Sequence, residues 1–97
     1  MKNIGIVGAR KYRDRQSVID LVNSLSRNTT VITSSCRGVC TWAGQAAKAA
    51  GIKIRLFTPD LTDIRSHSDM VQRYYHRNRQ LIAACDIVHA FIAKEGL

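Results

Sequence analysis

Short apolar runs alternate with helical patterns along this chain, and the alternation constrains the fold more than any other feature. Four runs rich in β-branched residues predict strands, at residues 3–8, 31–33, 52–57 and 87–92. The stretches between them carry helical patterns, and helices that join parallel strands lie over the faces of the sheet. The sequence therefore predicts an α/β fold: a three-layer Rossmann-like domain with a short parallel sheet of about four strands and helices on both faces.

The first two predicted helices have clear apolar faces. The face of the first helix, which begins at Asp14 or Ser17, consists of Val18, Leu21, Val22 and Leu25. The second helix, residues 41–50, is rich in alanine, so it can lie close against a sheet. Gly51 is suited to follow its last turn.

The third predicted helix begins at Asp69 and carries a mixed stripe. The residues that share this stripe are Val71, Tyr75, Asn78, Ile82 and Cys85. Asn78 is the polar member, and a buried carboxamide without a partner costs roughly 1–3 kcal/mol. We therefore expect Asn78 to meet either the loop after the first strand or a bound ligand.

Charge narrows the classes of partner. The chain has 97 residues with 15 Lys plus Arg against 7 Asp plus Glu, so its net charge is +8. A field of this sign attracts anions, and phosphate in some form is the leading partner class. The basic residues are scattered, which is also typical of solvated surface charges, so charge alone does not separate a nucleotide from a polynucleotide.

Length and composition also bound the organisation and the location of the protein. An apolar fraction of 45% predicts one compact domain over residues 1–97. No apolar run reaches the roughly 18 residues of a membrane span, and no signal peptide precedes the first strand. We expect a cytoplasmic protein without a membrane partner. Three cysteines without a secretory signal predict reduced thiols, and no zinc spacing is completed, so no metal site is expected.

Two loops that follow neighbouring strands carry the candidate binding residues. They are Gly8, Ala9, Arg10, Tyr12 and Asp14 in the first loop, and Ser34, Ser35, Arg37 and Gly38 in the second. Arginine offers a bidentate fork for phosphate, and hydroxyls beside a helix N-terminus make an anion cradle. Because adjacent parallel strands end at one edge, Arg10 and Arg37 are predicted to converge on a phosphate. A solvated surface loop and simple N-capping are the alternative interpretations.

The run Arg77-Asn78-Arg79 completes the candidate site. Asn78 and Arg79 are predicted to close the pocket, whereas Arg73 and Arg77 are spaced as a solvated flank of the helix. No catalytic residue is predicted. Cys40 lies near a helix N-terminus, where a thiolate is stabilised, but no histidine is placed by the sequence as its base.

These elements, taken in order, resemble the SLOG superfamily of Rossmann-like nucleotide-binding domains, and within it the small YspA-related branch. The family's Gly-Ser-Arg followed by Tyr and Asp is similar to residues 8–14. Its strand followed by a Gly-Gly-Ala-Arg-Gly-Ala-Asp turn is similar to residues 31–40. Its Pro-Asp and Arg-Asn-Arg elements match residues 59–60 and 77–79. The resemblance covers nearly the whole chain.

The resemblance implies a module that binds a nucleotide or a nucleotide-derived ligand and serves as a sensor. Two alternatives follow from other members: single-stranded nucleic-acid binding, as in DprA, and a LOG-type phosphoribohydrolase. The chain departs from the pattern at Ala9, at Ser34-Ser35 and at Cys40. The Gly-Gly-x-Gly-Thr segment and the helical glutamate of the hydrolases are not found, and Glu95 is the sole glutamate. The balance is against an enzyme.

Self-association is the last expectation from the sequence. The family's next strand and covering helix do not follow the fourth strand, so the apolar face near Val88, Phe91 and Ile92 is predicted to lie partly open. A two-fold contact with a second copy would bury it, which predicts a homodimer. The competing interpretation is that the helix at residues 69–85 already covers this face.

Overall fold

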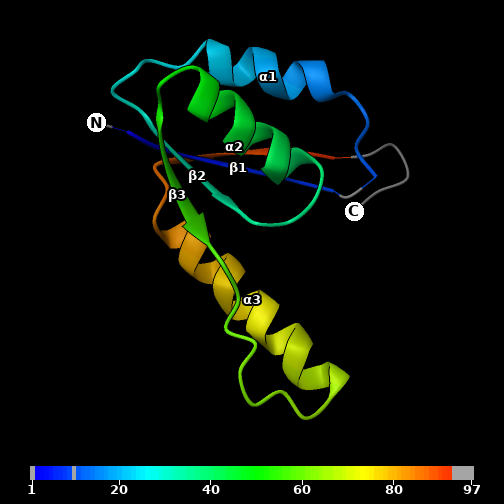
Figure 1. The fold of residues 1–97 in the computed structure, drawn as a ribbon. Coiled ribbons are helices and arrows are strands. Elements are labelled where there is room, and N and C mark those ends of the chain that lie inside the picture. Colours follow the sequence, from blue (N-terminus) through cyan, green and yellow to red (C-terminus); the bar gives the residue numbers. More distant parts are fainter. Residues whose placement is uncertain (1, 10, 93–97) are drawn as a thin grey trace.

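A computed structural model describes residues 2–9 and 11–92 of the chain (Figure 1). Its elements are β1 (Asn3–Gly8), α1 (Arg15–Asn23), β2 (Thr30–Ser34), α2 (Val39–Ala49), β3 (Lys53–Phe57), α3 (His67–Ala83) and β4 (Ile87–Phe91). The strands form one parallel sheet in the order β3-β2-β1-β4. The predicted α/β class with a short parallel sheet is confirmed. Among the described residues, no helix is long and apolar enough to cross a membrane.

The helices α1 and α2 lie together over one face of the sheet (Figure 1). Their buried side chains meet those of the two central strands in a single core of Ile4, Ile6, Val18, Val22, Val31, Val39, Ala43, Ala47 and Ile52. Trp42 is partly buried and packs against this core. The apolar faces predicted for both helices are therefore confirmed, and the alanines do let α2 pack against the sheet.

The opposite face belongs to α3, and here the predicted stripe is wrong. The side chains of Val71, Tyr75, Asn78 and Ile82 are exposed, whereas Arg77 and Leu81 are the buried residues of this helix. The helix packs against β2 and β3 through its C-terminal half, while its N-terminal end extends away from the sheet (Figure 1). Two stripes compete on α3, and contact with the sheet selects the one that contains Arg77 and Leu81.

The prediction of a fourth buried strand is also wrong. Because β4 forms one edge of the sheet and α3 diverges from it, Ile87 and Val88 are exposed, as is Ile92 just beyond the strand. Phe91 differs from them: it is half-buried, and its ring centroid lies 5.2 Å from that of Tyr12. The apolar face expected to be open is therefore open at Val88 and Ile92.

Element boundaries shift by one or two residues from the prediction. The second strand is longer, β3 begins at Lys53, and the third helix begins at His67, where the Ser66 hydroxyl accepts a hydrogen bond from the backbone N–H of Asp69. The second helix begins at Val39 instead of residue 41. Gly51 follows it with a φ of 72°, as expected for the residue after a helix.

Candidate functional site

The carboxyl ends of the parallel strands meet at one edge of the sheet, and a groove lies there. The chain passes from β1 outward to β2 and β3, and β4 lies on the other side of β1, so the strand order reverses beside β1. Open α/β sheets bind ligands at such a switch point. We call this hollow, with a volume of about 300 Å³, the switch-point groove. Its polar lining consists of Ser34, Cys36, Arg77 and Asn78, and its apolar lining includes Val7, Leu81, Ile82, Ala90 and Ile92.

The N-terminus of α2 follows β2 after a turn at residues 35–38, and no side-chain cap is present there among the residues that the structure describes. Gly38 is its N-cap residue, with a φ of 83° and a ψ of −124°, a conformation that requires glycine. A Cβ at Gly8 would stand 2.5 Å from Cγ2 of Val39, so the end of β1 lies against the first turn of α2. Uncapped backbone N–H groups and the helix dipole both favour an anion at this end.

The turn between β2 and α2 is held in place by hydroxyl groups. The Ser34 hydroxyl is buried, donates to Sγ of Cys40 at 3.1 Å and accepts from the backbone N–H of Cys36 at 3.3 Å. One residue earlier, the Thr33 hydroxyl donates to the carbonyl of Ile6 at 2.6 Å. Ser34 therefore holds the turn in its conformation, and its hydroxyl is already engaged.

Arg77 reaches this turn from the middle of α3. It is only 5% exposed, its Nε donates to Oδ1 of Asn78 at 2.8 Å, and one terminal nitrogen donates to Sγ of Cys36 at 3.7 Å. The guanidinium lies 5.5 Å from the ring centroid of Tyr74. Its other terminal nitrogen, NH1, is buried and has no hydrogen-bond partner within the described part of the chain. A buried cation with an unsatisfied donor is costly unless an anion pairs with it.

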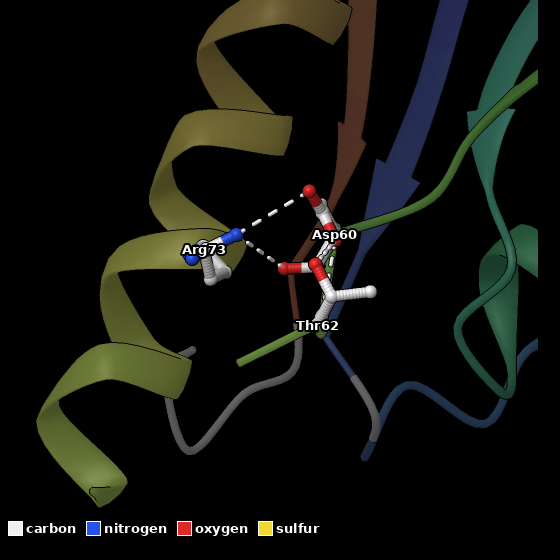
Figure 2. Close-up of polar contacts among 3 residues, drawn as sticks. All are labelled: Asp60, Thr62 and Arg73. Carbon is white, nitrogen blue, oxygen red and sulfur yellow. Dashed lines mark hydrogen bonds and ion pairs between the residues drawn. The ribbon is translucent and has the colours of Figure 1, made fainter. Parts of the chain in front are cut away.

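Arg73 lies one turn earlier on α3 and, unlike Arg77, forms an ion pair with a carboxylate. Figure 2 shows its guanidinium directed at Asp60, with an N–O distance of 3.4 Å to the carboxylate and 3.2 Å to the backbone carbonyl. Hydrogen bonds from the hydroxyl and backbone N–H of Thr62, with the charge of Arg73 adding to them, hold the pKa of Asp60 below its ordinary value. Arg73 is half-buried and paired, whereas Arg77 is buried and has no ion pair among residues 2–9 and 11–92.

Asn78 has a different surrounding from the one predicted. It is exposed, and its partner is the adjacent Arg77, so neither the loop after β1 nor a ligand is needed to satisfy its Oδ1. It nevertheless lines the switch-point groove. Its hydrogen bond fixes Nε of Arg77 and leaves the far end of the guanidinium to face the turn before α2.

The structure brings some of the predicted binding residues together. Gly8 and Ser34 line the switch-point groove with Asn78, and Gly38 caps the adjacent helix. Ser35 and Arg37 are exposed and line an adjoining hollow of about 520 Å³, which Cys36 and Arg77 also border. Gly8, Ser34 and Asn78 in the first hollow, and Ser35 and Arg37 in the second, therefore line spaces that Arg77 also lines.

Other predicted residues do not line this groove. The backbone N–H of Ala9 donates to the carbonyl of Phe91, and Tyr12 and Asp14 both contact Ser17, where Asp14 caps α1. Arg79 borders an outer groove of about 830 Å³ along α3. Arg10, predicted as a phosphate ligand, lies outside the residues that the structure describes.

The residue that sequence reasoning missed is Arg77. Met70, Tyr74 and Leu81 recur at helical spacing, and Arg77 falls on the same stripe. A cation within an apolar stripe is the signal that could have identified it.

No protein-family model, curated protein or solved structure matches this chain. No group of three or more His, Cys, Asp or Glu side chains suited to a metal ion occurs in the part that the structure describes. The function must therefore be inferred from the chemistry of the groove.

Proposed function

We propose that this protein binds a phosphate-bearing ligand of nucleotide type in the switch-point groove. The observation that carries the proposal is the guanidinium of Arg77, which is buried against Cys36 in the turn before α2 and keeps NH1 without a partner among the described residues. A guanidinium and the uncapped start of a helix are both donors for phosphate oxygens. Membership of the SLOG superfamily and a cytoplasmic location remain predictions from the sequence.

The groove offers different chemistry to the two parts of such a ligand. The phosphate would accept hydrogen bonds from NH1 of Arg77 and from backbone N–H groups of the first turn of α2, and Arg37 borders the adjoining hollow. The base or sugar would lie along the apolar lining from β1, β4 and α3. A volume of about 300 Å³ is at the small end of ligand sites, which favours a mononucleotide over a dinucleotide.

Binding of a single nucleic-acid strand is the second candidate, and a different surface supports it. The outer groove along α3 is bordered by Arg73, His76 and Arg79, and Tyr75 beside them is 67% exposed. Cationic side chains beside an exposed aromatic ring are typical of surfaces on which bases stack and phosphates are neutralised.

Calorimetric titration with AMP tests the first candidate. We expect the wild-type protein and Arg73→Met to bind AMP and Arg77→Met to lose measurable binding, since Arg77 is the only described residue with an unpartnered buried donor. Arg37→Ala should weaken binding if its side chain joins the phosphate site. Retention of wild-type affinity by Arg77→Met would place the ligand elsewhere.

Salt dependence separates the two candidates. A mononucleotide in the groove should respond weakly to salt between 50 and 200 mM, whereas a single-stranded oligonucleotide with six or more phosphate contacts loses about 300-fold or more in affinity over this range. The matched variant for the second candidate is Tyr75→Ala, which should weaken oligonucleotide binding and leave AMP binding unchanged.

A further inference from the structure

The three cysteines of the chain occupy three different environments. Cys40 is buried, where it accepts a hydrogen bond from Ser34 and lies 4.0 Å from the carbonyl of Ile6. Cys85 donates to the carbonyl of Leu81 at 3.0 Å, and burial, followed by the charge of Asp86, raises the pKa of its thiol. Cys36 is half-buried, lines the switch-point groove and receives a hydrogen bond from Arg77.

The surroundings of Cys36 favour its anionic form. A guanidinium within hydrogen-bond distance stabilises a thiolate, and so does the start of a helix three residues further along the chain. Arg77 is 95% buried and no carboxylate pairs with it within the described residues, so its charge is not neutralised by another acidic side chain there. A thiolate at Cys36 and a ligand phosphate would therefore compete for the same cation.

We propose that Cys36 is the reactive thiol of this protein and that its oxidation by a hydroperoxide blocks the anion site beside Arg77. The blocking part rests on the proposed function, whereas the reactivity of the thiol does not. Among the residues that the structure describes, Cys36 is the one nucleophile that contacts a buried cation with an unsatisfied donor.

The oxidation step is balanced by the peroxide alone. The Cys36 thiolate attacks one peroxide oxygen, an S–O bond forms, and the O–O bond breaks. Sulfur loses two electrons, and the other peroxide oxygen departs as hydroxide from hydrogen peroxide or as alkoxide from an organic hydroperoxide. This anion takes a proton from solvent to become water or an alcohol. The product is a sulfenic acid. Its oxygen is an acceptor close to Arg77, so it would satisfy the guanidinium and fill space at the junction of the two hollows that Cys36 lines.

Competitive alkylation with limiting iodoacetamide, followed by peptide mass spectrometry, tests the reactivity. We expect Cys36 to be labelled first, ahead of Cys85 and the buried Cys40. In Arg77→Met the labelling rate of Cys36 near neutral pH should fall about tenfold or more. The reason is that a neighbouring opposite charge typically lowers the pKa of an acidic group by about one unit or more, and the variant lacks this charge. Arg73→Met is the matched control and should label like the wild type.

The rate of Cys85 labelling serves as an internal check on folding, because it should be the same in all variants. Labelling of Cys85 before Cys36, or an unchanged Cys36 rate in a folded Arg77→Met, would overturn the assignment of the reactive thiol.

The blocking part needs a second experiment. Treatment with hydrogen peroxide should add one oxygen to Cys36 and abolish AMP binding in calorimetry, and dithiothreitol should restore it. Oxidised protein that still binds AMP would overturn the blocking step. If the reduced protein does not bind AMP at all, the proposed function fails instead, and the alkylation order still decides whether Cys36 is the reactive thiol.

Discussion

The face of the sheet beneath α1 and α2 encloses aliphatic side chains that solvent does not reach, whereas the face toward α3 buries a guanidinium and leaves isoleucine exposed. Ile6 on the first face is fully buried, and Ile82 on the second is 57% exposed. Close packing of apolar groups contributes stability in proportion to the area removed from water. The first face thus supplies most of the closed core, while the second buries Leu81 but keeps a cation and open apolar surface.

The same substitution on the two faces tests this difference and carries the largest expected effect. Ile6→Ala should lower the free energy of unfolding by about 2–5 kcal/mol, since it leaves a cavity in a closed core. Ile82→Ala should change it by less than about 0.5 kcal/mol, because the side chain is exposed and alanine favours helix. Urea denaturation of both variants measures the two values, and equal losses would contradict the division between the faces.

Arg77→Met sharpens the comparison by removing the buried charge of the α3 face. Arg77 has no carboxylate partner among the described residues, and replacing this buried cation with an apolar side chain of similar length should raise the free energy of unfolding, by about 1 kcal/mol or more without ligand. Thermal unfolding in phosphate-free buffer is the measurement, with Arg73→Met as the control. A large destabilisation would mean that the contacts of Arg77 with Tyr74 and Asn78 outweigh the cost of burying its charge.

The open surface at Ile82, Val88 and Ile92 also predicts self-association. Light scattering over a range of concentrations should show an increase from monomer toward dimer mass. Ile82→Glu should suppress this increase at unchanged stability, whereas Asn23→Glu on α1 should not. A strictly monomeric species at high concentration would show that α3 covers this face sufficiently.

The smallest expected effect concerns the exposed ion pair that contrasts with Arg77. Because the pKa of Asp60 is lower in the folded than in the unfolded state, its carboxylate stabilises the fold at neutral pH. This contribution disappears as the pH falls through the folded-state value. Asp60→Asn should therefore lower the free energy of unfolding slightly at pH 7. At a pH below the folded-state pKa of Asp60 the substitution should have no such effect. The control is Asp63→Asn, at a left-handed position that asparagine tolerates.

The sequence predicted the site only in part. It placed the glycine turn between β2 and α2 correctly, because a strand, a glycine turn and an alanine-rich helix follow one another locally. It assigned Asn78 to a buried stripe and Arg77 to a solvated flank, and the structure reverses these positions. Whether a side chain on a long helix is buried depends on which face meets the sheet, and that is a contact between segments about 40 residues apart.

By itself, the amino-acid sequence determined the alternation of strands and helices, the parallel sheet and the closed core of α1 and α2, because periodicity and β-branched runs act over a few residues. Only the tertiary structure decided the strand order, the exposure of β3 and β4 at the edges, and the rotation of α3 that buries Arg77 against the turn after β2. These features depend on the total apolar area that segments far apart in the sequence bury against one another. A local sequence pattern does not determine that area.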